Sequence, residues 1–181
     1  MKKIILGILG TVILTTGLLA KDNMYIGAEV GYTNHTIEDD DFKSNSEATY
    51  TAYKIGKYFD EYRLSMSLEN SSKIGINADY LFIQENTSFT PYLGATIKYN
   101  YVKESYTRKA TFKKETYSRS VIFLGVTLGF IYEINDSFEL DTRCGAEISK
   151  YHISDSNGND RGRTSANQIS CGVGINYLFR D

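Results

Sequence analysis

The last strand-like segment of the chain constrains the fold more than any other stretch. Between residues 169 and 179, every second residue is apolar or aromatic: Ile169, Cys171, Val173, Ile175, Tyr177 and Phe179. The residues between them are polar or glycine, apart from Leu178. Because successive side chains of a β-strand point to opposite faces, this two-residue period predicts a strand with one apolar face.

The first twenty residues have the features of a secretory signal peptide. Lys2 and Lys3 precede an apolar run from Ile4 to Leu14, and Ala20 is a small residue at the expected cleavage site. The alternative, a transmembrane anchor, is disfavoured because the run is short for a bilayer. We therefore expect a signal peptide at residues 1–20 and a single mature domain at residues 21–181.

The composition of the mature chain narrows the class of protein. Two of the 20 basic residues lie in the signal, which leaves 18 against 22 acidic residues and does not suggest a nucleic-acid partner. No later apolar run reaches the roughly 18 residues of a transmembrane helix. If the mature chain is a membrane protein, it must be a closed β-barrel, because a bilayer offers no water to unpaired backbone groups.

Further alternating segments precede the last one. We predict eight strands, at residues 24–33, 49–59, 62–69, 73–82, 91–101, 121–133, 138–148 and 169–179. Long connections at residues 35–47, 103–119 and 152–165 alternate with short turns. The fold class predicted is therefore all-β: an eight-stranded antiparallel up-and-down transmembrane β-barrel after a cleaved signal peptide.

The glycines provide a test of the face assignment, which rests on the apolar residues alone. Of 15 glycines, three lie in the signal and two in the last loop, and all ten in the strands fall on the inward face. An eight-stranded barrel has an interior just wide enough for side chains, so large residues must alternate with very small ones.

The inward face also carries charges of both signs. Burying any of them alone would be costly, so we predict an internal network of ion pairs rather than an open channel, with a proton or ion path as the alternative. The predicted members are Glu29, Lys54, Arg63, Glu69, Lys73, Asp79, Lys98, Glu133, Glu139, Asp141, Arg143 and Glu147.

The chain ends with the motif Gly174-x-x-Tyr177-x-Phe179. This motif resembles the C-terminal recognition signal of bacterial outer-membrane β-barrels, although Arg180 and Asp181 follow the aromatic residue that usually ends the chain in that family. The resemblance implies insertion into the outer membrane by the outer-membrane assembly machinery.

The whole mature chain resembles the small eight-stranded barrels of the OmpX, Ail and opacity type and the transmembrane part of OmpA. The resemblance implies a surface role such as adhesion, envelope integrity or resistance to host defences, carried by loops. A narrow porin-like channel is the alternative. Outer-membrane lipid and lipopolysaccharide are the expected surroundings, and no cofactor is implied.

Two cysteines have positions that are related through the last hairpin. Asn157-Gly158 is a strong signal for a two-residue turn, and a hairpin centred there pairs residues whose numbers add to 315. Cys144 and Cys171 satisfy this sum and both lie on the outward face. We predict a cross-strand disulfide in an oxidising compartment, with two free thiols facing lipid as the alternative.

Candidate catalytic and metal-binding residues are few. His152-Ile153-Ser154 is similar to the His-x-Ser of outer-membrane lipid A deacylases, but no glutamate follows Glu147 to complete a triad. The acidic run Asp39–Asp41 lacks the spacing and the glycine of a calcium loop. We expect a protein that is not an enzyme and binds no metal, with a lipid A-modifying hydrolase as a second alternative.

The connection at residues 103–119 is the best candidate for ligand binding. It interleaves Tyr106, Phe112 and Tyr117 with basic residues, a combination that suits phosphate or sulfate groups. Lipopolysaccharide and host or surface glycans carry such groups, and a merely solvated hairpin is the alternative. The basic residues are Lys103, Arg108, Lys109, Lys113, Lys114 and Arg119.

Overall fold

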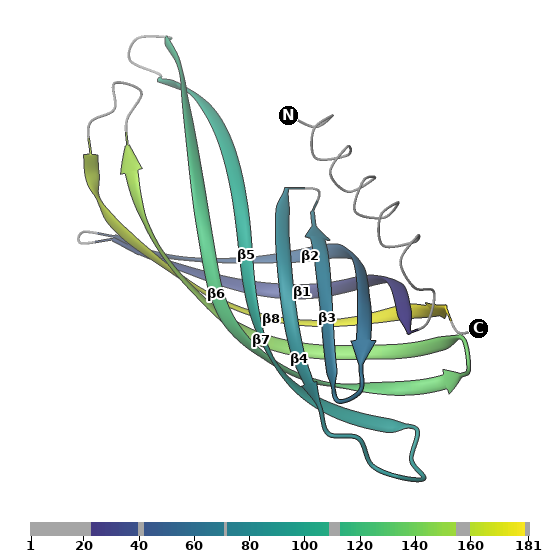
Figure 1. Cartoon of the computed structure of the whole chain (residues 1–181). Helices are drawn as coiled ribbons and strands as arrows, with labels where there is room; N and C mark the ends of the chain where they lie inside the picture. The colour runs from purple at the N-terminus through teal and green to yellow at the C-terminus, as the bar shows by residue number, and fades with distance from the viewer. Residues whose placement is uncertain (1–22, 40–41, 71, 109–112, 155–159, 180–181) are drawn as a thin grey trace.

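The computed structural model is a closed barrel (Figure 1). The structure describes residues 23–39, 42–70, 72–108, 113–154 and 160–179. Within these ranges eight antiparallel strands follow one another round the barrel in sequence order, and the last closes it against the first. The predicted all-β, up-and-down barrel is confirmed. The strands are β1 (Met24–Asp39), β2 (Phe42–Phe59), β3 (Tyr62–Glu69), β4 (Lys73–Leu81), β5 (Phe89–Arg108), β6 (Lys113–Asn135), β7 (Phe138–Ser154) and β8 (Asp160–Phe179).

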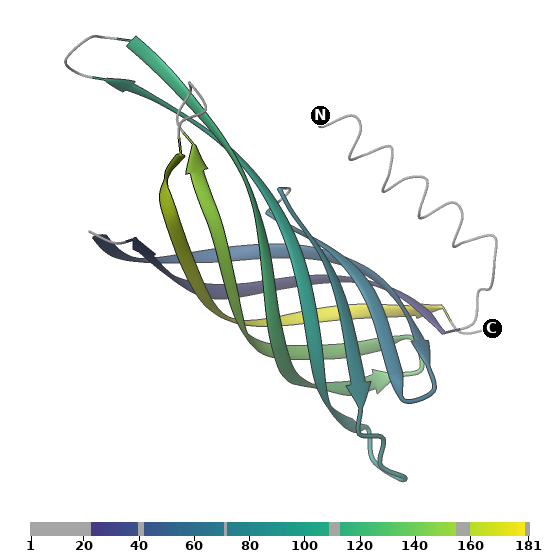
Figure 2. The ribbon, with the colours of Figure 1, turned by 60° about the vertical axis from the view of Figure 1, so that its left-hand side comes forward.

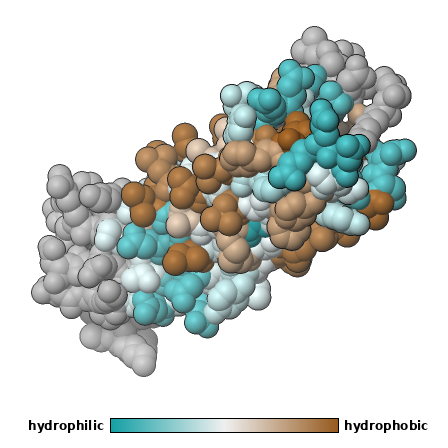
Figure 3. All heavy atoms as spheres, turned by 90° about the horizontal axis from the view of Figure 1, so that it is seen from below, coloured by the Kyte–Doolittle hydropathy of each residue, from teal (hydrophilic) through white to brown (hydrophobic). Residues whose placement is uncertain are grey.

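The two-residue period places apolar side chains outside and polar side chains inside. On β3, Tyr62 and Leu64 are exposed, whereas Arg63 and Ser65 are buried. Exposed apolar residues gather over the middle of the barrel wall (Figure 3). A continuous apolar exterior around a polar interior is the reverse of a protein in water, and it suits a hydrocarbon solvent. No helix among the described residues is long and apolar enough to cross a membrane.

Inward glycines make room for large side chains from neighbouring strands. A Cβ atom at Gly56 would lie 2.5 Å from the ring of Tyr25, and one at Gly31 would lie 2.5 Å from the ring of Tyr50. Both tyrosines are buried, with exposed fractions of 0% and 3%. The alternation of small and large residues that the sequence predicts is therefore present across adjacent strands.

The two ends of the barrel differ in their connections. Residues 23 and 179 lie at one end, which we call the terminal end, together with the turns at residues 60–61, 82–88 and 136–137. The opposite end, which we call the hairpin end, carries the connections β1–β2, β3–β4, β5–β6 and β7–β8. Aromatic side chains mark the outside of the terminal end, where Tyr177 packs edge-on against Phe138 and Phe179 with ring centroids 5.3 and 5.2 Å apart.

The strands at the hairpin end are longer than predicted. The segments predicted as loops at residues 35–47, 103–119 and 152–165 are largely continuations of strands, and the β5–β6 register runs unbroken from Phe89↔Tyr132 to Arg108↔Lys113. The physical reason is that a strand needs an apolar face only where it contacts an apolar medium. The alternation of apolar and polar residues in the sequence therefore ends before the paired strand ends. Smaller differences are that β4 ends at Leu81 and β5 begins at Phe89.

Unequal strand lengths leave the β5–β6 hairpin standing well beyond the neighbouring barrel wall. β3 and β4 have only 8 and 9 residues, whereas β5 and β6 have 20 and 23. The register of β5 with β4 ends at Asn100, and that of β6 with β7 begins at Leu124. Residues 101–108 and 113–120 pair with each other, and we call this two-stranded segment the arm. Figure 2 shows it extending past the β3–β4 hairpin.

Candidate functional site

Arg63 on β3 is the centre of a network of buried charges in the lumen. Its Nε donates a hydrogen bond to Asp79 Oδ2 at 2.8 Å, and its Nη1 donates to Asp141 Oδ2 at 3.0 Å. Lys54 Nζ donates to the same Asp141 oxygen at 3.0 Å. Side chains from β2, β3, β4 and β7 therefore meet inside the barrel through charge-assisted hydrogen bonds, which are about twice as strong as neutral ones.

Glu29 on β1 extends this network towards the middle of the barrel. Its Oε1 accepts hydrogen bonds from Arg143 Nε at 3.0 Å and from the Tyr50 hydroxyl at 2.6 Å, and its Oε2 is paired with Lys54. Every strand except β5, β6 and β8 contributes a charge. We call Glu29, Lys54, Arg63, Asp79, Asp141 and Arg143 the terminal-side network.

Tyrosine side chains surround the Arg63 guanidinium. Its carbon lies 4.6 Å from the ring centroid of Tyr92, 5.7 Å from that of Tyr25 and 6.0 Å from that of Tyr58. The Tyr92 hydroxyl also donates to Asp141 Oδ1 at 2.9 Å. Aromatic faces attract a desolvated cation, so these rings take part in holding the charge. Sequence reasoning missed their role, although all three tyrosines fall on the inward set of residues.

A second network, which we call the hairpin-side network, consists of Glu69, Lys73, Lys98 and Glu147. Lys98 Nζ lies 2.9 Å from Glu69 Oε2 and 2.6 Å from Glu147 Oε1. Lys73 Nζ lies 2.7 Å from Glu69 Oε1 and donates to Gln168 Oε1 at 3.1 Å. Two cations thus face two carboxylates, so this network is neutral as a unit.

A neutral layer lies between the two networks. Asn77 Nδ2 donates to Ser65 Oγ at 3.1 Å, and Thr96 Oγ1 donates to Asn77 Oδ1 at 2.9 Å. Together with the charged networks, this layer lines the described lumen with buried polar side chains. Among the residues that the structure describes, no group of three histidine, cysteine, aspartate or glutamate side chains could hold a metal ion.

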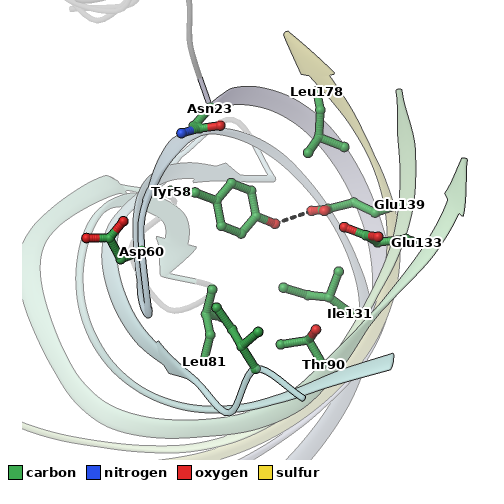
Figure 4. Close-up of a pocket in the computed structure, with 10 residues that line it drawn as sticks. Asn23, Tyr58, Asp60, Leu81, Thr90, Ile131, Glu133, Glu139 and Leu178 are labelled. Atoms are coloured by element: carbon green, nitrogen blue, oxygen red, sulfur yellow. Dashed lines mark hydrogen bonds between the residues drawn. The ribbon is translucent and has the colours of Figure 1, made fainter. Parts of the chain in front are cut away.

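All predicted members of the charge network except Glu133 are buried. Glu133 is exposed, because β6 ends at a register shift between Glu133 and Asn135 at the rim of the barrel. It faces a cavity of 260 Å³ at the terminal end, where Glu139, Tyr58 and Asp60 also lie (Figure 4). Glu133 therefore differs in burial from the other predicted members, since the last inward position of the strand lies in the opening.

The two cysteines lie side by side on the outer face. Cys144 on β7 is the register partner of Cys171 on β8, as the turn at Asn157-Gly158 predicts. Their Cα atoms are 4.1 Å apart and their sulfurs are joined at 2.12 Å. Both residues are exposed on the apolar exterior.

The predicted ligand-binding residues all belong to the β5–β6 hairpin. Lys103 and Arg108 lie on β5, and Lys113, Lys114 and Arg119 lie on β6. The register places Arg108 opposite Lys113 and Lys103 opposite Ser118. Lys109 lies outside the described residues. The backbone therefore brings basic positions from both strands together on the arm.

The remaining candidates lie near the ends of the barrel. His152 and Ser154 are on β7, with backbone positions opposite Arg163 and Asp160 on β8. Asp40 and Asp41 lie outside the described residues. Gly174 of the C-terminal motif packs closely against β1, where a Cβ atom would lie 2.7 Å from the carbonyl oxygen of Ala28.

Comparisons with known proteins agree with this architecture. Residues 30–177 match the family described as Opacity family porin protein. Neisserial surface protein A has a crystal structure that is 16% identical with a TM-score of 0.62, covering 86% of this chain and 97% of the other. The outer-membrane protein OprG from Pseudomonas aeruginosa is 12% identical with a TM-score of 0.54, covering 88% and 97% of the two chains. A search of curated proteins finds no match.

Proposed function

This chain belongs to the opacity family of porin proteins, and we propose that it binds sulfated or phosphorylated glycans at the bacterial surface through its basic arm. The chain is an outer-membrane β-barrel, so the apolar exterior faces lipid. Barrels of this class have short turns on the periplasmic side and longer connections outside. The terminal end therefore faces the periplasm, and the arm faces the extracellular medium.

The charge of the arm is the observation that carries this proposal. Residues 101–120 contain the six basic residues Lys103, Arg108, Lys109, Lys113, Lys114 and Arg119 against only Glu104 and Glu115, whereas the whole chain has 20 basic and 22 acidic residues. An excess of four positive charges on one two-stranded segment attracts anionic groups and speeds their encounter. Lysine and arginine are the side chains that bind phosphate and sulfate oxygens.

The packed lumen supports a structural scaffold rather than a pore. Arg63 and Asp141 are 2% and 0% exposed, and their ion pair lies across the route that a solute would follow. A narrow channel remains the alternative function, because the family carries the porin description. Planar-bilayer recordings with stable, reproducible conductance would favour the channel over the scaffold.

The hydrolase alternative depends on His152 and Ser154. Both lie on the β7–β8 hairpin, two residues apart on one strand. A lipid A-modifying activity would require a measurable change in lipid A that His152→Ala abolishes. The absence of that change would refute the hydrolase alternative.

The experiment that tests the proposal is a binding assay with the barrel in lipid nanodiscs. The ligands are lipopolysaccharide and a panel of sulfated glycans, and the variant has residues 105–117 replaced by a short turn. A matched control replaces residues 37–45, at the tip of the acidic β1–β2 hairpin, in the same way. We expect salt-sensitive binding by the intact protein and by the control but not by the arm variant. Equal binding by all three proteins would refute a role for the arm.

A further inference from the structure

The disulfide between Cys144 and Cys171 is surrounded by uncharged residues on the outer wall of the barrel. Both cysteines are exposed there, on the face that contacts lipid. The outward positions next to them along their own strands, and opposite them on the flanking strands, are Thr142 and Ala146 on β7, Ile169 and Val173 on β8, Leu128 on β6 and Tyr32 on β1.

The apolar wall extends past the disulfide towards both ends of the barrel. A strand rises about 3.3 Å per residue and barrel strands are tilted by about 35–45°, so Cys171 lies about 15 Å from the aromatic ring of Tyr177 along the membrane normal. Towards the hairpin end, Ile148 and Ile169 are 60% and 64% exposed. The apolar band of such barrels is about 25 Å tall between its aromatic girdles. The disulfide therefore lies within the hydrocarbon layer.

The hydrocarbon layer prevents thiol–disulfide chemistry at this position. A disulfide forms or breaks when a thiolate attacks a sulfur, and a second thiolate leaves. A thiolate next to Cys144 or Cys171 would have no water to solvate it, and the six outward neighbours provide no positive charge. Burying such an ion without a partner is very costly. Charged oxidants and reductants are excluded from the layer for the same reason.

We infer that the disulfide forms in the periplasm, before the β7–β8 hairpin enters the membrane, and that lipid then seals it against reduction. The oxidant is a periplasmic protein or small molecule with an accessible disulfide. One cysteine thiolate attacks this disulfide to form a mixed disulfide, and the second cysteine then displaces the oxidant as a dithiol. Two electrons and two protons pass from Cys144 and Cys171 to the oxidant, so the exchange balances.

The position of the two cysteines in the chain suits early oxidation. Cys144 and Cys171 lie on consecutive strands with a sequence separation of 27, and they are register partners. Their pairing therefore needs only the last hairpin, and none of the contacts that close the barrel between β1 and β8. The hairpin would then enter the membrane with its two strands already joined.

Reduction in lipid vesicles tests the seal. The oxidised barrel is treated with the charged reductant tris(2-carboxyethyl)phosphine and then alkylated, and its intact mass counts the labels. We expect no label on the natural protein in vesicles. In urea, where the chain is unfolded and hydrated, the same treatment should add two labels.

A matched control places the cysteine pair on the same two strands but outside the apolar band. It combines Lys150→Cys and Ser165→Cys with Cys144→Ala and Cys171→Ala. Positions 150 and 165 are register partners, and they lie about 15 Å nearer the hairpin end along the normal. Reductant should open this disulfide completely in vesicles. A natural pair that is reduced as fast as the control, or a control as resistant as the natural pair, would overturn the inference.

The order of oxidation and insertion is tested with the natural protein. The reduced chain is refolded into vesicles, and oxidised glutathione is added either before insertion or after it. Addition before insertion should produce the disulfide, whereas addition afterwards should leave both thiols free. Equal oxidation in the two cases would refute the inference. Because this measurement needs no variant, it remains decisive if the control pair does not form.

Discussion

Arg63 and Asp141 are 78 positions apart in the sequence and lie on β3 and β7, yet Arg63 Nη1 and Asp141 Oδ2 are 3.0 Å apart inside the barrel. Because both side chains are almost fully shielded from solvent, the pair differs from a surface ion pair. Removing one partner of such a pair leaves an uncompensated charge in a medium that solvates it poorly. The pair therefore links strands that do not touch through their backbones.

Replacing Asp141 by alanine should destabilise the barrel strongly. Lys54 and Arg63 both donate to this carboxylate, so its loss leaves two cations short of a partner. We expect the free energy of unfolding to fall by about 3–5 kcal/mol. Reversible urea unfolding in lipid vesicles measures the change, and Asp136→Ala in an exposed turn is the control. A fall no larger than that of the control would mean that water reaches the lumen.

Much of the barrel could be predicted from local patterns. The inward and outward faces follow from the two-residue period, since a strand in a barrel alternates between two media. The pairing of Cys144 with Cys171 agrees with a turn at Asn157-Gly158, because the register of such a turn holds from Phe138↔Tyr177 to His152↔Arg163. It shifts by one residue only between His152 and Ser154, next to the turn. Both predictions depend on local sequence: the first on the period within one strand, and the second on a turn between two consecutive strands.

The details that could not be predicted depend on contacts between distant strands, or on where each strand leaves the apolar layer of the membrane. The sequence identifies the charged interior but does not tell that Glu29 pairs with Arg143, because that contact crosses the lumen and depends on strand tilt. The exposure of Glu133 depends on where β6 reaches the rim. The continuation of β5 to Arg108 depends on pairing with β6 where alternation has ended.

Gly94 should tolerate alanine less well than Gly145. A Cβ atom at Gly94 would lie 2.1 Å from Asp79 Oδ1, so Asp79 would have to move from Arg63, whereas at Gly145 the nearest atom is Thr127 Cγ2 at 3.0 Å. We expect Gly94→Ala to cost about 1–3 kcal/mol more than Gly145→Ala, in the range of overpacking. Urea unfolding in lipid vesicles compares the two variants. Both replace glycine by alanine, so the loss of conformational entropy in the unfolded chain is the same and cancels in the comparison. Equal costs would show that Asp79 can shift freely.

The two sulfurs should be oxidised in the protein extracted from outer membranes. Alkylation without reductant should then add no label to Cys144 or Cys171, and alkylation after reduction should add two, as intact mass would show. The loop between them has a sequence separation of 27. Closing a loop of this length stabilises a protein by about 3.5 kcal/mol in the chain-entropy model, so reductant should also lower the urea midpoint. Labelling of both thiols without reductant would contradict the disulfide.

The affinity of the arm for sulfated glycans should follow its charge rather than its shape. The double variant Lys113→Gln, Lys114→Gln removes two of the six basic side chains and should weaken binding roughly tenfold at low salt, a loss of about 1.4 kcal/mol. The matched variant Lys113→Arg, Lys114→Arg keeps both charges and should bind as the natural protein does. In about 0.5 M salt the affinities of the natural protein and the two variants should become equal, because salt screens the attraction between charges. A loss of binding in the arginine variant, or a difference that persists at high salt, would point instead to contacts specific for lysine.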